Sequence, residues 1–271
     1  TLKNNSNVKC VIPVHMAGAP VNMKEIYNIS KFNKLKIIED AAHALGAKYE
    51  NGSKVGSCKY SDMTVFSFHP VKIITGGEGG VVTTNNFKIY QKLLELRSHG
   101  IYSQNKKFKN KSIAYTNGIK NIWYYEMSNP SFHYRITDIQ SSLILSQIKK
   151  INKFLKHRKK IAIRYDQYFK KIDFINVFQE KLRSYSSNHL YILNIDFNKF
   201  SINRNKFMKY LRKKEIITQV HYIPIYYQPF YKINPYSIKK LKNSKKYYQN
   251  CLSIPLYYGL TFKQQNYIIK I

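Results

Sequence analysis

Two short apolar runs separated by a helical pattern constrain the fold of this chain more than any other feature. Lys9 to Val14 has the composition of a short buried strand, and Leu35 to Ile38 is a second apolar run that ends in Glu39 and Asp40. Between them, apolar residues recur at helical spacing from Met23 to Ile29. A strand, a helix and a strand within about 30 residues form a unit with parallel strands, and ligands of such units bind beyond the strand carboxyl ends. His15 and Asp40 follow the two strands, so the sequence predicts an α/β fold with polar groups at one sheet edge.

The rest of the first half continues this pattern. Met63 to Phe68 is another strand candidate, and residues 81–84 continue the sheet after a run of glycines. Asn86 to His99 is predicted to be a helix with Asn86 as its N-cap and Gly100 as its stop signal. Residues 101–131 have weak periodicity, and we expect a long excursion there.

A capping box marks the start of the longest helical pattern. Thr137 is followed three residues later by Gln140, the spacing at which the two side chains and backbones bond reciprocally. We expect one long helix whose apolar face is formed by Ile139, Leu143, Ile148, Ile151 and Leu155. After about residue 170, short strand-like runs, a lysine-rich helix near 206–214 and the aromatic segment 220–226 indicate an α+β unit. The predicted division is therefore residues 1–148 and a smaller C-terminal domain of residues 149–271, reached through the long helix.

The charge is strongly positive, with 46 Lys and Arg against 14 Asp and Glu and a formal net charge of +32. Such an excess raises nucleic acid or an anionic membrane surface as partners. The abundance of Lys, Asn, Ile and Tyr together is also typical of an A+T-rich coding bias with lysines on solvated faces. Because the basic residues are spread along the chain and no nucleic-acid-binding motif is present, the sequence does not favour nucleic acid as a partner.

Cysteine and histidine usage argues for a reduced compartment and against a metal site. Cys10, Cys58 and Cys251 are odd in number and far apart, and no metal-ligand spacing surrounds the eight histidines. No apolar stretch has the length of a membrane-spanning helix. We expect a cytoplasmic protein with no metal and no membrane association.

Lys72 is the candidate nucleophile. It lies in SFHPVKIITGGEGG, between a turn stiffened by Pro70 and four glycines that permit close approach of the backbone to a ligand. An amine becomes a useful nucleophile when a partly desolvated pocket lets it lose its proton, or when it already forms an imine with a carbonyl cofactor. The glycines match neither a phosphate-binding P-loop nor a dinucleotide fingerprint. Taken alone, the segment is equally compatible with a surface lysine before an ordinary turn.

Three residues upstream corroborate Lys72. Asp40 ends an inner strand, and a carboxylate there would keep the nitrogen of a pyridoxal phosphate ring protonated. His43 would contact the same ring, and the Ser67 hydroxyl would bind the phosphate. Each residue also has a structural alternative: Asp40 as the N-cap of a following helix, His43 as a surface histidine of that helix, and Ser67 as a plain strand serine.

These motifs occur in an order that resembles a known family. The segments IIEDAAHALGA, VGSCKYSDMTVFSFHPVKIITGGEGGVVTTN, RSHGI, YRITDIQSSLILSQI and QVHYIPIYYQPFY are similar to the pyridoxal phosphate-dependent sugar-nucleotide aminotransferases of the DegT and StrS type. The resemblance covers nearly the whole chain. Within the family, SFHPVK, EDAAHALGA and VHYIPI most resemble the branch of pseudaminic acid biosynthesis, which serves surface polysaccharide and flagellin glycosylation.

The resemblance implies a fold, a reaction and roles for seven residues. The fold is the PLP-dependent transferase fold type I, here a truncated large domain followed by a small C-terminal α+β domain. The reaction transfers an amino group from glutamate to C4 of a UDP-linked 4-keto-6-deoxy-N-acetylhexosamine, in a homodimer that shares its sites between subunits. Lys72 is implied as the catalytic lysine that carries the cofactor. Asp40, His43, Ser67 and His133 are implied as further cofactor ligands, and His221 and Tyr222 as substrate contacts.

Two departures from the family pattern accompany the resemblance. The residue before Tyr134 and Arg135 is an asparagine in the family, where it reaches the cofactor phosphate of the neighbouring subunit, and here it is His133. Family members also have an N-terminal stretch, with a phosphate-binding loop, that precedes the strand matched by Lys9 to Val14. We therefore expect a fragment of a longer reading frame. An inactive remnant of the family and a basic nucleic-acid-binding protein remain as alternatives.

Overall fold

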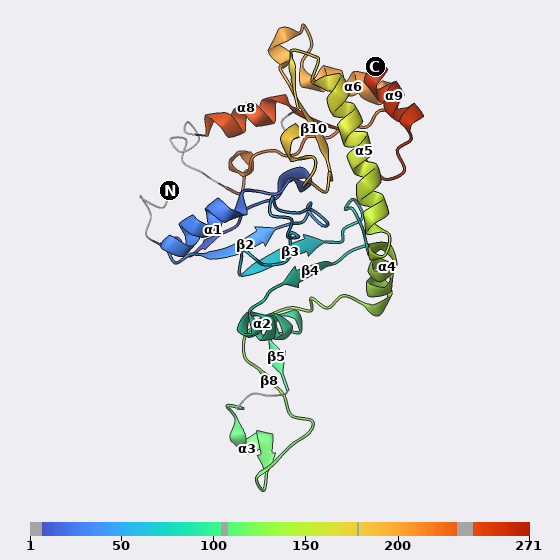
Figure 1. Ribbon diagram of the computed structural model, residues 1–271. Helices are drawn as coiled ribbons and strands as arrows, with labels where there is room; N and C mark the ends of the chain where they lie inside the picture. The colour runs from blue at the N-terminus through green and yellow to red at the C-terminus, as the bar shows by residue number, and fades with distance from the viewer. Residues whose placement is uncertain (1–6, 104–107, 178, 232–240) are drawn as a thin grey trace.

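A mixed four-stranded sheet organises the first half of the chain in the computed structural model, which describes residues 7–103, 108–177, 179–231 and 241–271 (Figure 1). Its strands follow one another in chain order: β1 (Cys10–Val11), β2 (Lys36–Asp40), β3 (Met63–Ser67) and β4 (Gly80–Thr83). The first three strands are parallel, and β4 is antiparallel to β3.

The predicted strand–helix–strand unit is present. Helix α1 (Met23–Phe32) connects β1 to β2, and its N-cap Asn22 accepts a hydrogen bond from the Glu25 backbone N–H. Strand β1 is shorter than the predicted Lys9–Val14, because Pro13 has no N–H with which to continue the ladder. Val14 still pairs with Asp40 in an isolated parallel bridge, so the two strand ends stay adjacent.

A hairpin between β3 and β4 returns the chain to the end of β3. Ser67 pairs with Gly80, and the intervening residues form the loop that contains Lys72. A Cβ atom at Gly80 would lie 2.8 Å from the Phe66 carbonyl oxygen, so a larger residue could not fit in this register. Glycine at this position is therefore a requirement of the strand pairing.

The expected excursion after residue 100 projects away from the sheet (Figure 1). It follows α2 (Phe87–Arg97) and consists of β5 (Ile101–Tyr102), α3 (Lys111–Ala114), β6 (Tyr115–Thr116), β7 (Ile119–Lys120) and β8 (Glu126–Met127). Glu126 holds the parts of this excursion together by accepting hydrogen bonds from Tyr124 Oη and the Asn110 backbone N–H. Desolvation opposes the charge of this carboxylate, but the hydrogen bonds outweigh it and lower the pKa of Glu126 to about 2.

The long helix predicted after Thr137 is two helices, α4 (Asp138–Ile148) and α5 (Ile151–Phe169). The capping box at Thr137 and Gln140 is confirmed. The predicted apolar face is wrong in α4, where Ile139 is 76% exposed and Ile144 is buried instead. The reason is tertiary, because Ile144 packs against the glycine loop and a Cβ on Gly76 would lie 2.8 Å from its side chain. The domain division at 148 and 149 lies beside this break and stays a prediction.

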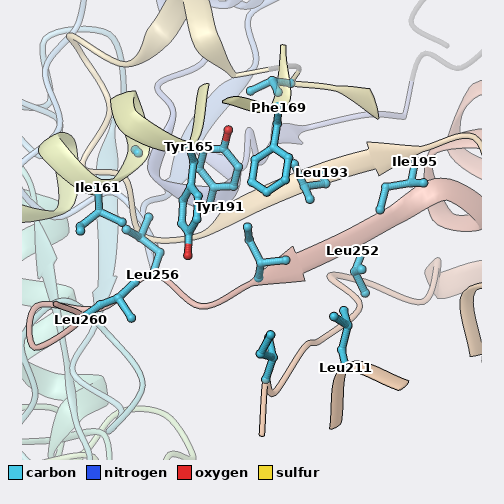
Figure 2. Packing of buried hydrophobic residues seen from close by; sticks show 14 residues of the cluster. Ile161, Tyr165, Phe169, Tyr191, Leu193, Ile195, Leu211, Leu252, Leu256 and Leu260 are labelled. Carbon is cyan, nitrogen blue, oxygen red and sulfur yellow. The ribbon is translucent and has the colours of Figure 1, made fainter. Parts of the chain in front are cut away.

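A second, antiparallel sheet forms the upper part of Figure 1, with strand order β11 (Cys251–Ile254), β10 (Tyr191–Ile195) and β9 (Ile175–Asn176). Helices α5, α6 (Arg204–Lys213), α8 (Lys242–Asn250) and α9 (Phe262–Lys270) surround it. Figure 2 shows its core, in which Tyr165 and Phe169 of α5 lie against Tyr191 and Leu193 of β10. Within the described residues, no helix has the length and apolar composition needed to cross a membrane.

A buried ion pair ties α5 to this sheet. Asp166 accepts two hydrogen bonds from Arg183, at 2.9 Å and 3.1 Å, and a third of 2.8 Å from the Tyr191 hydroxyl. All three side chains are buried, so the bidentate geometry is needed to compensate the desolvation of the two charges.

Core packing in this unit can be tested with two matched substitutions. Ile195→Ala removes a side chain that is 4% exposed and should lower the unfolding free energy by about 2–4 kcal/mol, because it leaves a cavity. Ile217→Ala truncates a side chain that is 57% exposed and should change it by less than about 0.5 kcal/mol. Urea titration followed by circular dichroism measures both, and equal losses would contradict the assignment of the core.

Candidate active site

Asp40 lies at the carboxyl end of β2, held there by two backbone hydrogen bonds. Its N–H donates to the Pro13 carbonyl at 2.9 Å, and its carbonyl accepts from the His15 N–H at 3.0 Å. The carboxylate atom Oδ1 accepts from the Ala42 N–H at 3.0 Å. Residues 41–47 form turns, so the alternative of Asp40 as a helix N-cap is wrong. The carboxylate is thus fixed at the sheet edge that the sequence predicted for a ligand.

Glu39, the neighbour of Asp40, forms a buried polar network on the other face of β2. His15 is fully buried, and its Nδ1 accepts from the Val21 N–H at 3.1 Å, so its Nε2–H donates to Glu39 at 2.7 Å. The hydroxyls of Tyr49, Ser61 and Thr64 also donate to this carboxylate. Burial opposes the charge of Glu39, but the hydrogen bonds from His15, Ser61 and Tyr49 lower its pKa.

The loop that carries Lys72 is anchored on both sides. Its ends are joined by hydrogen bonds from the Phe68 N–H to the Gly79 carbonyl and from the Gly76 N–H to the Phe68 carbonyl. Ile73 and Ile74, the next two residues, are buried in a cluster with Ile144 of α4. Gln147 of α4 accepts from the Thr75 N–H at 3.2 Å and donates to the Thr75 carbonyl at 3.1 Å. Lys72 therefore projects from a rigid loop, and the alternative of a free surface lysine is not what the structure shows.

The ammonium group of Lys72 loses its proton more readily than that of an ordinary lysine, because its pKa is lowered. Partial burial lowers its pKa, and the Asp40 carboxylate partly offsets this effect. The Lys72 amine and the Asp40 carboxylate therefore interact electrostatically within one site.

Three imidazoles and a phenol lie around this pair. His43 is 9% exposed, and its Nε2 is hydrogen-bonded to Tyr222 Oη at 3.2 Å. Its ring centroid lies 4.5 Å from that of His189, and His221 Nδ1 is bonded to Ser253 Oγ at 2.7 Å. Burial, then the charge of Lys72, then that of His221 lower the pKa of His43 to about 4, and Asp40 opposes this. His43 is therefore neutral at neutral pH.

The structure brings together five of the seven predicted site residues. Lys72, Asp40, His43, His221 and Tyr222 interact through hydrogen bonds or electrostatics. Ser67 ends β3, the strand beside β2, and its Oγ accepts from the His69 N–H at 3.3 Å. The exposed His133 lies instead at the end of α2, where it pairs with Ser98 and its ring contacts His99 at 5.5 Å. No described contact joins it to Lys72, so its role stays a prediction.

Two features of the site were missed by sequence reasoning. His189 comes just before β10, about 120 positions after Lys72, and only folding places its ring against His43. The Glu39 network was also missed, although His15 was noted at a strand end. A glutamate at an inner position of a buried strand is the signal that could have revealed it, since such a charge must be paired.

The state of Lys72 can be measured without any ligand. In competitive acylation followed by mass spectrometry, the pH at which Lys72 becomes half reactive should lie below that of Lys36, whose pKa the Asp62 carboxylate raises. Asp40→Asn should lower the Lys72 midpoint further, because it removes the charge that stabilises the ammonium form. A midpoint for Lys72 at or above that of Lys36 would contradict the desolvated-amine assignment.

The Glu39 network should contribute strongly to stability above pH 4.5. Glu39→Gln leaves buried donors facing an amide NH₂ and should lower the unfolding free energy by about 2–4 kcal/mol, whereas the exposed Glu50→Gln should change it by less than about 0.5 kcal/mol. Because the folded-state pKa of Glu39 lies below 4.5, its contribution is present above that pH and is lost as the pH falls through the folded-state value. Urea titrations at several pH values measure both effects. The assignment would be contradicted if the stability of Glu39→Gln depended on pH in the same way as that of the parent chain.

Solved structures share this arrangement of elements. A structure of Helicobacter pylori PseC, described as an aminotransferase involved in pseudoaminic acid biosynthesis, superposes with a TM-score of 0.84 at 31% identity, over 98% of this chain and 66% of that one. The PLP-form of the putative sugar aminotransferase Spr1654 from Streptococcus pneumoniae gives 0.80 at 28% identity, over 98% and 68%. These matches confirm the predicted fold class.

Sequence relatives extend over nearly the whole chain. A UDP-4-amino-4,6-dideoxy-N-acetyl-beta-L-altrosamine transaminase of Campylobacter jejuni is 35% identical over 267 residues, which are 98% of this chain and 65% of the relative. An uncharacterised protein of Methanocaldococcus jannaschii is 40% identical over 255 residues, 93% of this chain and 63% of its own length. The chain thus spans somewhat less than two thirds of the length of these two relatives. Since residues 3–271 also match the DegT/DnrJ/EryC1/StrS aminotransferase family, the chain belongs to that family.

Proposed function

We propose that this chain carries the lysine site of a pyridoxal phosphate-dependent aminotransferase that acts on a sugar nucleotide. The observation that carries the proposal is that the partly desolvated Lys72 amine interacts electrostatically with the Asp40 carboxylate at the end of the parallel strand β2. Such an amine can bond a carbonyl carbon and later exchange protons. Membership of the aminotransferase family supports the same reaction class.

The residues present fit the cofactor chemically. The site offers an amine for the aldehyde, a carboxylate for the pyridine nitrogen, a hydroxyl for the phosphate and a neutral imidazole for the ring, from Lys72, Asp40, Ser67 and His43 respectively. His133 would contact the phosphate from a neighbouring subunit. When bound, pyridoxal phosphate supplies a carbonyl that condenses with amines and a ring that accepts electrons. The named PLP-form of the pneumococcal relative supports this choice of cofactor.

Lys72 is the proton-transfer group in this proposal. Because burial lowers its pKa, its amine can take a proton from a substrate carbon and return it at moderate pH. The Asp40 carboxylate, at the end of β2, stabilises the ammonium form of Lys72 and so keeps the Lys72 amine from becoming too weak a base. Burial, then Asp40, raises the pKa of Tyr222, so its hydroxyl stays protonated and its hydrogen bond to His43 persists.

The proposed substrates are glutamate and a UDP-linked 4-keto-6-deoxy-N-acetylhexosamine that is aminated at C4. Support comes from the names of the Campylobacter and Helicobacter relatives, which are transaminases of a UDP-4-amino-4,6-dideoxy sugar. His221 and Tyr222 are the proposed substrate contacts, because both side chains come from the C-terminal half and lie within electrostatic reach of Lys72 or Asp40. The route served is nucleotide-sugar, specifically pseudaminic acid, biosynthesis.

A homodimer in the cytoplasm completes the proposal. Exposed apolar side chains along α4, among them Ile139 and Leu145, support burial against a second copy. Their position next to the Lys72 loop would let a neighbouring subunit contribute to the site. All three cysteines are free thiols, which is consistent with a reducing compartment.

The experiment that tests the proposal is covalent trapping. The purified chain is mixed with pyridoxal phosphate, reduced with borohydride and digested, and the modified peptide is identified by mass spectrometry. We expect the adduct on Lys72, its loss in Lys72→Ala, and its retention in the matched exposed-lysine variant Lys54→Ala. Adduct on other lysines only, or equal trapping in Lys72→Ala, would reject the lysine site and favour an inactive remnant.

A further inference from the structure

His189 is a buried titratable side chain to which the proposed reaction assigns no role. It lies just before β10 in the second unit, is 4% exposed, and its Nδ1 is buried without a hydrogen-bond partner. A histidine buried at this cost in desolvation needs a reason. Its closest ring neighbour is His43, at a centroid distance of 4.5 Å and an interplanar angle of 40°.

The backbone around His189 is fixed from two directions. Its N–H donates to the Ala17 carbonyl at 3.0 Å, and its carbonyl accepts from Arg158 Nη1 of α5 at 3.1 Å. Ser187, two residues earlier, donates through Oγ to the His43 carbonyl at 2.7 Å. Gly18 permits this approach, because a Cβ there would lie 2.2 Å from Ser187 Oγ. The position of the His189 ring relative to His43 is therefore determined by the fold.

The packing of the two rings removes His43 from water. The titratable groups that act on His43 are Lys72, His221 and Asp40, with Tyr222 hydrogen-bonded to its Nε2, and those that act on His189 are His43, Arg158, Lys72 and His221. The pKa of His189 is held well below its usual range, first by burial and then by the neighbouring His43, Arg158, Lys72 and His221. Both imidazoles are thus neutral beside the Lys72 amine, and a proton on either would be repelled by it.

We propose that His189 is a positioning residue of the Lys72 site: its ring packs against His43 and fixes the imidazole that bonds Tyr222. The role rests on the proposed function, in which His43 contacts the cofactor ring. Through this contact, a residue of the C-terminal unit fixes the position of a side chain from the turns after β2. His189 itself touches His43 and acts through it.

Substitutions of His189 distinguish a role in ring packing from a role in hydrogen bonding. If packing matters, His189→Phe retains the aromatic surface and should preserve the His43 environment, whereas His189→Ala should admit water beside His43. His157 of α5 is a matched control, since it is a half-buried histidine that bonds the Leu260 carbonyl and contacts Tyr258, and no described contact joins it to His43 or Lys72.

The test measures the titration of His43 by NMR on chains labelled at histidine, and the affinity for pyridoxal phosphate by absorbance. In His189→Ala, the pKa of His43 should rise from about 4 towards 6.5, since burial is the largest cause of its depression. Affinity for pyridoxal phosphate should weaken by about tenfold or more through misplacement of His43. His189→Phe and His157→Ala should match the parent chain in both measurements.

The outcomes separate this inference from the proposed function. An unchanged His43 titration in His189→Ala, with only a lower melting temperature, would overturn the positioning role, as would a Phe variant that titrates like the Ala variant. If the parent chain forms no adduct at Lys72, the proposed function fails. The titration of His43 then still decides whether His189 controls its environment.

Discussion

The buried carboxylate of Glu39 is the constraint on which the first half of the structure depends. A charge with no exposure to water is tolerated only because His15, Tyr49, Ser61 and Thr64 all donate to it. These donors come from the loop after β1, the turns after β2 and the start of β3. Satisfying one carboxylate therefore fixes the relative positions of three strand ends. Because side chains alternate along a strand, it also directs the next residue, Asp40, to the opposite face, where Lys72 lies.

The candidate site combines groups from both units of the chain. The first half of the chain supplies Asp40, His43 and Lys72, and the second unit supplies His189, His221 and Tyr222. Their common property is partial or complete desolvation, which favours the neutral forms of His43 and of the Lys72 amine. A single carboxylate limits this effect at Lys72. Burial is a usual means by which a protein obtains a neutral lysine amine at moderate pH, and the Asp40 carboxylate opposes it at this site.

Local patterns predicted the parallel strand–helix–strand unit, the two strands that flank the Lys72 segment and the capping box at Thr137, because each is specified by residues close together in the chain. The prediction of one long helix was wrong. The apolar pattern continues past Lys149 and Lys150, and Ile144 of α4 packs with Ile151 and Leu155 of α5 in the cluster of the Lys72 loop. Further along α5, Tyr165 packs against the second sheet. Helical periodicity shows that a helix has an apolar face, but it does not show where the helix breaks or where its packing partner changes.

The sequence by itself determined the fold class, the family resemblance and the order of the site residues Asp40, His43, Ser67 and Lys72. Strand ends and glycine turns are specified by neighbouring residues, so they can be recognised without any knowledge of distant contacts. The tertiary structure decided which histidines surround the lysine. His189 and His221 are separated from His43 by more than a hundred positions, and only His221 lies in a segment that the sequence singled out. Their contacts depend on how the second sheet packs on the first, and desolvation, which sets the charge of every group in the site, exists only after that packing has occurred.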